Sequence, residues 1–359
     1  MSTMAAFGSA LSRIFDRAET TTGEAHGAQS VVLDLLDRTV RDARLGIQVG
    51  GRSFTVGQGT GELLATLRLR EAPRARTGRS KADNVQRHYD AGDELFAAFL
   101  DPTMTYSCGY MASPDDSLEK MQRNKFERIC RKLELRPGDR LLDIGCGFGG
   151  LLIHAATHHC AHGVGVTNSR RHCARGQENV ARAGLADRIE IRSDDFTRVT
   201  ERFDRVVSVG MMEHVPRREY AAYFAAIARV LAPDERGLVH TIGCAGSTND
   251  HDPFIQKYIF PGSGQPRLSE IAGGLERERL AILDVENIVR HHGHTILRWL
   301  ANFRRNRGSL DPARHDDRLC RMFEYYFHCG IAAAFAAESA VFQVLFAADA
   351  AAPMRLHRV

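Results

Sequence analysis

Hydrophobic and polar residues follow two different periods over the last two thirds of the chain. Stretches with apolar residues at helical spacing alternate with short apolar runs that are bounded by glycine or charged residues, as is typical of strands. The helical spacing predicts helices at 118–135, 151–158, 170–183, 218–231 and about 321–337. The short runs predict strands beginning at 141 and at 163–167, 189–192, 205–209, 237–242 and about 341–346. This alternation predicts an α/β protein with a parallel sheet and helices on both faces.

The pattern before residue 81 is weaker and of a different kind. Residues 1 to 27 are rich in small and polar residues. Residues 31–49 carry apolar residues at helical spacing, and two short apolar runs follow at 53–56 and 63–67. These features predict a small α+β unit. A chain of 359 residues is long enough for one large domain with an appendage. We therefore expect an N-terminal unit with its linker over 1–80 and a larger main domain over 81–359.

The stretch LLDIGCGFGG, residues 141–150, is the strongest local signal in the chain. An apolar run leads into Asp143, and Gly145, Gly147 and Gly149 precede the next apolar run. This order predicts a strand, a tight turn and a helix. Because glycine lacks a Cβ atom, such a turn brings backbone N–H groups and a helix N-terminus close to a ligand. A nucleotide-like cofactor is the natural ligand for this turn.

Gly145, Gly147 and Gly150 also fit the dinucleotide pattern G-x-G-x-x-G, which alone is a weak signal. A pyrophosphate would lie beside the Asp143 carboxylate, whereas NAD sites carry their acid about 20 residues later. The next predicted strand runs through Thr167 to Ser169 with no acid. A carboxylate at the end of the first strand suits a cationic ligand instead, such as S-adenosylmethionine (SAM). We therefore favour a SAM loop over an NAD loop.

Polar residues follow the other predicted strands at their carboxyl ends, where ligands bind in parallel sheets. This rule places Asp143, Thr167, Asp195, Glu213 and His240 around one crevice. Asp195 can accept a hydrogen bond from an adenine amino group while its neighbour Phe196 packs on the ring. A solvated acidic turn is about as compatible with these two residues, and their position in the crevice favours adenine.

Glu213 and His240 are candidates for holding or exchanging a proton. Either is equally compatible with a satisfied polar group at a strand end. Two ligands without a further His or Cys at suitable spacing make a poor metal site, so no metal is expected. Cys108 has no adjacent base to lower its pKa, so we interpret it as a buried thiol or a backbone donor rather than a nucleophile.

Composition excludes few functions. The net charge of +4 and the pI near 8.7 permit an anionic partner without requiring one. The eight cysteines form no CxxC pair, which predicts reduced thiols and a cytoplasmic protein. The longest apolar region, 325–348, is interrupted by Glu338, so no spanning helix is expected. The basic run at 68–81 is interpreted as a solvated linker, with an anionic lipid surface as the alternative.

Taken together, these stretches resemble the cyclopropane-fatty-acyl-phospholipid synthases and mycolic-acid cyclopropane synthases. The likeness covers roughly 84–347, with a weaker likeness to that family's N-terminal lipid-binding domain before it. The more specific motifs are Tyr106-Ser107-Cys108, Met212-Glu213-His214-Val215, His240-Thr241-Ile242-Gly243 and Lys257-Tyr258-Ile259-Phe260-Pro261-Gly262. The resemblance implies a class I SAM-dependent methyltransferase, Rossmann-like, with a doubly wound seven-stranded sheet and a small N-terminal α+β domain.

The resemblance also implies roles for individual residues. A bicarbonate ion would be held by side chains matching Glu213, His240 and Tyr326 and by backbone groups at Cys108 and Ile242. The cofactor would be bound by residues that match the family's SAM site. These are Tyr106, Ser107, Asp143, Gly145, Gly147, Gly149, Thr167, Ser169, Asp195 and Phe196.

The chain departs from the resemblance at two histidines. His292 stands where relatives usually have a tyrosine, and His172 stands where a glutamine often follows the Thr167 strand. The first departure bears on the substrate and on the fate of the carbocation, because the same scaffold can also yield a methyl or methylene branch.

The leading hypothesis is cyclopropanation of unsaturated acyl chains in membrane phospholipids by an enzyme that touches an anionic membrane peripherally. The alternative is C-methylation of another lipid or small molecule. A nucleic-acid amine methyltransferase usually has a Pro-Pro-aromatic loop, and the chain contains no Pro-Pro, so no nucleic-acid partner is expected. A homodimer is compatible with these features.

Overall fold

The structure is a computed structural model and describes residues 45–49, 52–56, 92–245, 254–260, 262–336 and 339–349. The basic run at 68–81 and the apolar run at 63–67 lie outside the described residues. The expected boundary between two domains at residue 80 also falls there, so it stays a prediction.

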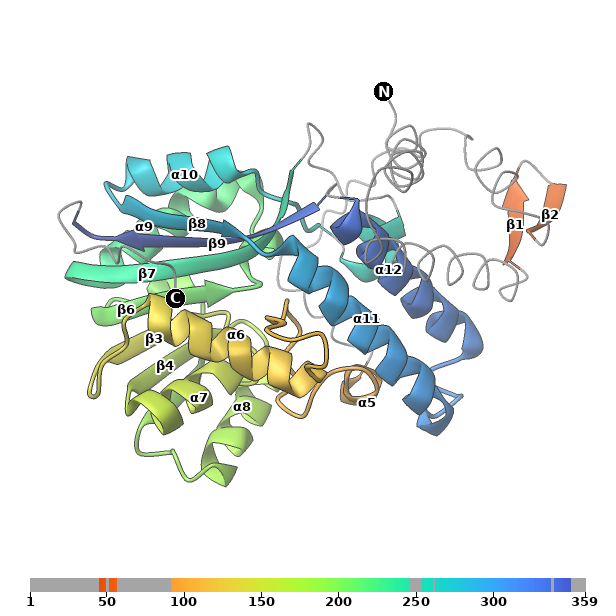
Figure 1. The fold of residues 1–359 in the computed structure, drawn as a ribbon, viewed down its shortest axis with the longest axis horizontal. Helices are drawn as coiled ribbons and strands as arrows, with labels where there is room; N and C mark the ends of the chain where they lie inside the picture. Colours follow the sequence, from red (N-terminus) through yellow and green to blue (C-terminus); the bar gives the residue numbers. More distant parts are fainter. Residues whose placement is uncertain are drawn as a thin grey trace.

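A seven-stranded mixed sheet lies at the centre of the described chain, with strand order β5-β4-β3-β6-β7-β9-β8 (Figure 1). Its strands are β3 (Arg140–Ile144), β4 (His162–Thr167), β5 (Ile189–Ser193), β6 (Phe203–Val209), β7 (Leu231–Cys244), β8 (Ala281–Asn287) and β9 (Ser339–Ala347). The first five are mutually parallel, as predicted.

The last strand breaks the predicted parallel pattern. Strand β9 runs antiparallel to both β7 and β8. The cause is the connection before it, because a helical hairpin leaves β8 at the carboxyl edge of the sheet and returns the chain to that same edge. Strand β9 must therefore run antiparallel to β8.

Helices cover both faces of the sheet, as the alternating pattern predicts (Figure 1). Successive strand residues point to opposite faces, so Leu141 packs with α6, α7 and α8 while Leu142 packs with α9 and α10. A serine caps the N-terminus of α6 and of α8. The Ser117 hydroxyl accepts a hydrogen bond from the Lys120 amide, and the Ser169 hydroxyl accepts one from the His172 amide. The five helices are α6 (Leu118–Lys132), α7 (Gly150–His159), α8 (Arg170–Arg182), α9 (Tyr220–Val230) and α10 (Leu268–Arg277).

A third apolar cluster lies beyond the carboxyl ends of the strands. Helices α11 (Val289–Asn306) and α12 (Asp317–Phe335) form the hairpin between β8 and β9, and the short helix α5 (Asp93–Ala97) packs against them. Phe99 makes edge-to-face contacts with Trp299, Phe303 and Phe327 in this cluster. This cluster therefore covers the carboxyl edge of the sheet, where a ligand would bind.

Short helical turns connect several of these elements. They are η1 (Phe196–Arg198), η2 (Met212–His214), η3 (Arg217–Glu219), the π-helical η4 (Ile255–Ile259) and η5 (Arg307–Ser309). No helix in the described ranges combines the length and the apolar character needed to cross a membrane.

Near the N-terminus the structure describes an antiparallel pair, β1 (Leu45–Val49) and β2 (Arg52–Val56). The helical interpretation of 31–49 is therefore wrong for its last five residues. The pairing of Val49 with Arg52 leaves only Gly50-Gly51 between the strands, a dipeptide that favours two-residue hairpin loops. This local turn signal outweighs the apolar spacing before it.

Candidate active site

Two adjoining cavities lie at the carboxyl edge of the sheet. The first, here called the loop cavity, has a volume of about 110 Å³, and the second, the aromatic cavity, has about 40 Å³. Gly210 and His214 line both of them. The loop cavity is lined by Ile144, Gly145, Gly147, Val166, Thr167, Asn168, Ser169, His172, Asp194, Phe196, Gly210, Met211 and His214.

The glycine loop forms one wall of the loop cavity, and its geometry explains its composition. Gly145 has φ +85°, and a Cβ atom there would lie 2.7 Å from Cγ of Met211. Gly147 has φ +54° and faces open space. Gly149, with φ +81°, is the N-cap of α7 and does not line the cavity. The loop can therefore approach a ligand closely with its backbone.

Asp143 precedes this loop in the sequence, is almost fully buried and is not among the residues that line either cavity. Its Oδ1 has no hydrogen-bond partner among the described residues. Burial raises the pKa of Asp143 to about 7, although the ammonium of Lys125 acts in the opposite direction. An orphaned buried carboxylate at this edge fits a ligand that carries positive charge, as a sulfonium cofactor with an amino group does.

The ends of β4 and β5 supply further polar groups to the loop cavity. The Thr167 hydroxyl accepts from the Ser169 amide, and both residues line the cavity. At the β5 end, Asp194 and Phe196 line it. The Asp195 carboxylate instead accepts from the amide and hydroxyl of Thr197 and caps η1. The acid that faces the cavity is therefore one residue earlier than expected.

The aromatic cavity brings together all five residues that were predicted to be catalytic. It also contains two residues predicted to bind the cofactor, Tyr106 and Ser107. Its lining consists of Tyr106, Ser107, Cys108, Gly210, Glu213, His214, His240, Ile242, Phe260, Ser263, His292, Trp299 and Tyr326. These residues come from seven separated stretches of sequence.

Glu213, in η2, is a buried carboxylate with partners on β7. Its Oε2 accepts from the Thr241 hydroxyl at 2.9 Å, and its Oε1 accepts from the Ile242 amide at 3.4 Å. Burial raises its pKa to about 7, because the two hydrogen bonds only partly offset the loss of solvent. Glu213 can therefore change protonation state near neutral pH.

His240 is held by a chain of hydrogen bonds that determines its tautomer. Lys132 Nζ donates to Gln343 Oε1 at 2.9 Å, and Gln343 Nε2 lies 3.2 Å from His240 Nδ1. An ammonium only donates, so the Gln343 amide must present its NH₂ group to the imidazole. The Nδ1 atom then accepts, and the proton of neutral His240 sits on Nε2. Burial lowers the pKa of His240 well below its usual value, which keeps the ring neutral.

Tyr326, on α12, completes the polar lining. The Tyr106 hydroxyl donates to the Tyr326 hydroxyl at 2.9 Å, so the proton of Tyr326 remains available to a ligand. Tyr106 also stacks on Phe260 and packs against Trp299, and Phe260 meets Tyr326 edge to face. The walls of this cavity are therefore mainly aromatic.

Cys108 is buried, and its thiol donates to the Gly109 carbonyl at 3.2 Å. Burial raises its pKa to about 12, which agrees with the interpretation of an inert thiol. Two buried polar residues of α6 hold the neighbouring Ser107: Lys125 donates to its hydroxyl and Gln122 to its carbonyl.

Several lining or supporting residues were not found from the sequence. Gln343 is the one polar residue within the apolar run of β9, and that interruption was the available signal. Lys125 and Gln122 similarly lie on the buried face of α6. Trp299 and Ser263 carry no distinctive local pattern. His292 was identified only as a departure from the family, and its buried Nδ1 has no hydrogen-bond partner in the described structure.

Comparison with solved structures defines the class of this protein. The cyclopropane synthase MmaA2 from Mycobacterium tuberculosis superimposes with a TM-score of 0.71 at 26% identity, over 76% of this chain and 99% of that one. CmaA1, solved with SAH and CTAB, superimposes with a TM-score of 0.69 at 28% identity, over 75% and 98%. With its glycine loop and seven-stranded sheet, the fold is that of a class I SAM-dependent methyltransferase.

Sequence comparison identifies the family. The model of the mycolic acid cyclopropane synthetase family matches residues 76–344. The cyclopropane-fatty-acyl-phospholipid synthase of Escherichia coli K12 is 37% identical over 271 residues, which are 76% of this chain and 69% of that protein. The chain therefore belongs to the mycolic acid cyclopropane synthetase family of SAM-dependent methyltransferases, which confirms the resemblance found from the sequence.

Proposed function

We propose that the protein transfers the methyl carbon of SAM to a cis double bond in an acyl chain of a membrane phospholipid and closes a cyclopropane ring. The observation that carries this proposal is the aromatic cavity directly beside the loop cavity, with Glu213, His240 and Tyr326 in one small space. When bound, SAM supplies an electrophilic methyl group. The chain's own residues must then protect a carbocation on the substrate and accept one proton.

The aromatic lining suits a cation. An isolated alkene is a poor nucleophile, and its attack on the methyl carbon forms one C–C bond, breaks the C–S bond and leaves positive charge on the acyl chain. The faces of Tyr106, Phe260 and Trp299 can stabilise that charge and exclude water. Removal of a proton from the former methyl group then closes the ring.

A small anionic base is the second part of the proposal. The Nε2–H of His240 and the hydroxyl of Tyr326 are donors in the cavity, and Glu213 can accept or donate according to its protonation. These groups suit bicarbonate, whose oxygens accept and whose hydroxyl donates. The volume of the aromatic cavity is about 40 Å³, whereas one water molecule needs roughly 10–15 Å³. It therefore has room for a small ion.

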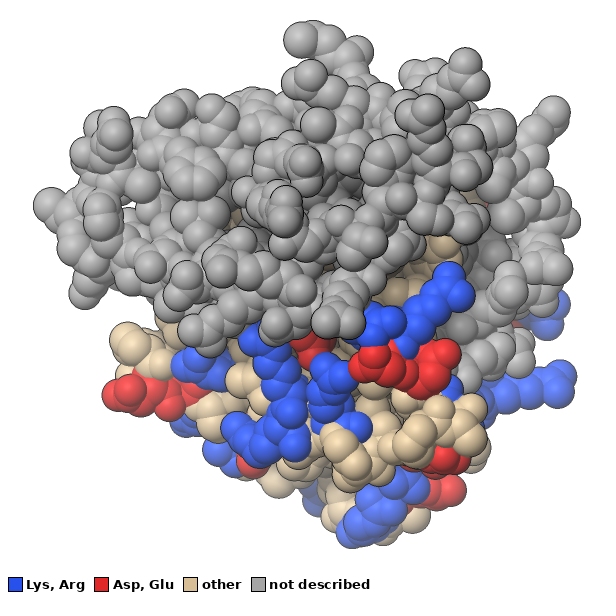
Figure 2. Space-filling view, turned by 90° about the vertical axis from the view of Figure 1, so that its right-hand side faces the viewer, with Lys and Arg blue, Asp and Glu red and all other residues tan. Residues whose placement is uncertain are grey.

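Contact with an anionic membrane is proposed for the end of the molecule formed by α11 and α12. Residues 304–321 contain six arginines and three aspartates. Figure 2 views the molecule from the side where this hairpin ends, and its described part shows several groups of basic side chains with acids between them. A basic residue near such a surface contributes about 1 kcal/mol of attraction, and less where it is already paired with an acid of the protein. Such pairs are formed by Arg304, Arg307, Arg314 and Arg321. Flotation with anionic but not with neutral vesicles would support this contact, and equal flotation with both would contradict it.

The central test uses methyl-labelled SAM and vesicles of an unsaturated phospholipid, with saturated vesicles as the control. We expect label in the unsaturated lipid only, and a mass gain of one methylene with an unchanged count of rings and double bonds. Resistance of the product to mild hydrogenation distinguishes a cyclopropane from a methylene branch. Absence of label from the lipid would overturn the proposal, and a saturated methyl branch would restrict it to C-methylation. Removal of dissolved carbonate should lower the rate, and added bicarbonate should restore it.

A further inference from the structure

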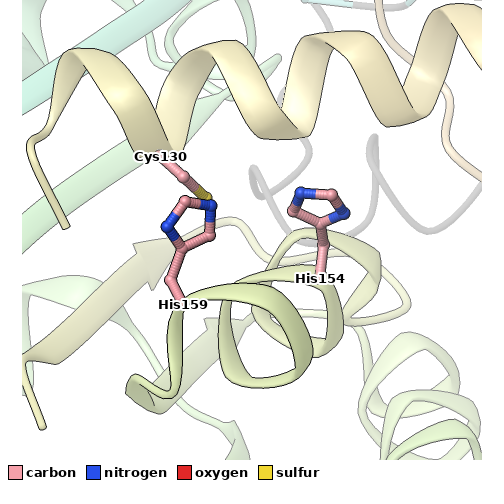
Figure 3. Close-up of side chains that lie close together, drawn as sticks. All are labelled: Cys130, His154 and His159. Carbon is pink, nitrogen blue, oxygen red and sulfur yellow. The ribbon is translucent and has the colours of Figure 1, made fainter. Parts of the chain in front are cut away.

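Three potential metal ligands converge between α6 and α7, away from both cavities. Cys130 lies on α6, and His154 and His159 lie on α7 (Figure 3). One ligand atom from each residue lies within 4.8 Å of the other two. None of the three lines the loop cavity or the aromatic cavity. The methyltransferase reaction proposed above gives this cluster no role.

A fourth group lies beside them. The Glu127 carboxylate is one turn before Cys130 on α6, and its Oε2 lies 3.2 Å from His154 Nε2 and 3.0 Å from His159 Nε2. In a tetrahedral site with metal–nitrogen and metal–oxygen bonds of about 2.0–2.1 Å, neighbouring ligand atoms are about 3.3 Å apart. The two imidazoles and this oxygen already have nearly that spacing, so Glu127 is placed to take the fourth position.

The ligand types select the metal. A thiolate, two imidazoles and a carboxylate suit zinc in a tetrahedral site, whereas calcium and magnesium prefer oxygen ligands alone. Zinc binds the thiolate form of cysteine, so binding would release the thiol proton of Cys130 to solvent.

We propose that Cys130, His154 and His159 form a zinc site, with Glu127 in the fourth position. This proposal departs from the expectation of no metal, which rested on ligand spacing along the sequence. The spacing was uninformative because the ligands are divided between two helices that pack side by side.

The location of the site indicates a structural role. Helix α7 begins directly after the glycine loop, and α6 carries Gln122 and Lys125, which hold Ser107 in the aromatic cavity. A metal that joins α6 to α7 would therefore stabilise the two helices that support both cavities. Because zinc would bind the folded chain only, it raises the unfolding temperature.

The test is zinc binding by the full-length chain, purified with a tag that contains no histidine and stripped with a chelator. We expect one zinc ion per chain, measured by elemental analysis and by titration against a competing chelator. Cys130→Ser and His159→Ala should weaken binding at least tenfold. The matched controls are His158→Ala, which changes the histidine between the proposed ligands, and Cys160→Ser, which changes an exposed cysteine. Both controls should bind zinc like the wild type.

Cobalt supplies a direct readout of the ligands. Cobalt(II) in the wild-type site should show a thiolate charge-transfer absorption that Cys130→Ser lacks. Zinc should raise the unfolding temperature of the wild type and of both controls but not that of Cys130→Ser. If Cys130→Ser does not fold without metal, His159→Ala provides the test, because its side chain is partly exposed. Failure of the wild type to bind zinc stoichiometrically would overturn the proposal, as would equally tight binding by Cys130→Ser or His159→Ala. Lipid labelling is measured separately, so its result does not affect this one.

Discussion

The loop cavity and the aromatic cavity share Gly210 and His214 but are built in opposite ways. The loop cavity is formed at the ends of the neighbouring strands β3, β4, β5 and β6, beginning with the glycine motif at 141–150. The aromatic cavity is assembled from stretches as far apart as Tyr106 and Tyr326, and α11 and α12 close it. In the proposed function, the first cavity holds the cofactor and the second shields the reaction from water.

The comparison predicts that the two cavities can be damaged separately. Glu213→Gln should lower the rate of product formation by about 10²–10⁴-fold, the range expected when a group that handles a proton is lost. SAM affinity should change little, because Glu213 does not line the loop cavity. Labelled-lipid assays and calorimetric titration with SAM measure the two effects.

The control for this change is Glu219→Gln, which alters a carboxylate on η3 outside both cavities. It should behave like the wild type in both assays. Full activity in Glu213→Gln would remove Glu213 from the proposed chemistry.

A smaller effect is expected at Gln343, which positions His240. In Gln343→Glu the introduced carboxylate can still accept from Lys132 but cannot donate to His240 Nδ1. The ring must then carry its proton on Nδ1, and the cavity loses the Nε2–H donor. We expect a rate lower by about 10–100-fold with SAM affinity retained.

The ¹⁵N chemical shifts of the His240 imidazole report the tautomer directly and separate this effect from a general disturbance. The methionine of Gln343→Met neither donates nor accepts a hydrogen bond strongly, so it does not fix the tautomer of His240. The rate of Gln343→Met should therefore lie between the rates of the wild type and of Gln343→Glu. An unchanged rate together with a proton on Nδ1 would show that the tautomer is irrelevant to the reaction.

The contrast between the cavities also explains how far the sequence could be interpreted. The loop cavity follows from one continuous motif, and five parallel strands follow from alternation. Strand β8 was missed because it carries Asp284 and Glu286 in place of a clean apolar run. Those acids are accommodated by Lys132 and Arg128, ion pairs between segments about 150 residues apart. Local patterns cannot show such pairs.

The residues of the aromatic cavity also could be predicted only in part from local sequence patterns. Glu213 and His240 follow from their places at strand ends, whereas Tyr326 and the Ile242 backbone came only from the family resemblance. Helix α11 was missed because its first turns, Val289 to His294, are rich in histidine and lack a helical apolar pattern. Trp299 lies on this helix and was therefore not identified from the sequence either. Residues brought together by the helical hairpin therefore required either a structure or a relative.

The role of Asp143 can be tested by measuring how SAM affinity depends on pH. With a pKa raised to about 7, its carboxyl group is protonated below neutrality and charged above it. If the charged form holds a cationic part of SAM, affinity rises with pH through 7 and falls by about tenfold between pH 8 and pH 6. Asp143→Asn should bind about tenfold more weakly at pH 8 and should show no such slope.

Glu213 also has a pKa of about 7, so it provides the internal control. Glu213→Gln should keep the pH dependence of SAM affinity. The same slope in Asp143→Asn as in the wild type would assign the titration to another group. Titration calorimetry at several pH values distinguishes these results.

The smallest effect is expected at His292, where the aromatic cavity meets the apolar cluster of α11 and α12. Its ring contacts Trp299 edge to face, its Nδ1 has no partner among the described atoms, and burial lowers its pKa to about 4. An unsatisfied buried polar atom costs about 1–3 kcal/mol. His292→Phe removes that atom while it keeps an aromatic ring, so it should raise the free energy of unfolding by about 1 kcal/mol. SAM affinity should be unchanged, and the rate should change only a few-fold. A rate loss as large as that of Glu213→Gln, without a gain in stability, would place His292 among the groups that act on the substrate.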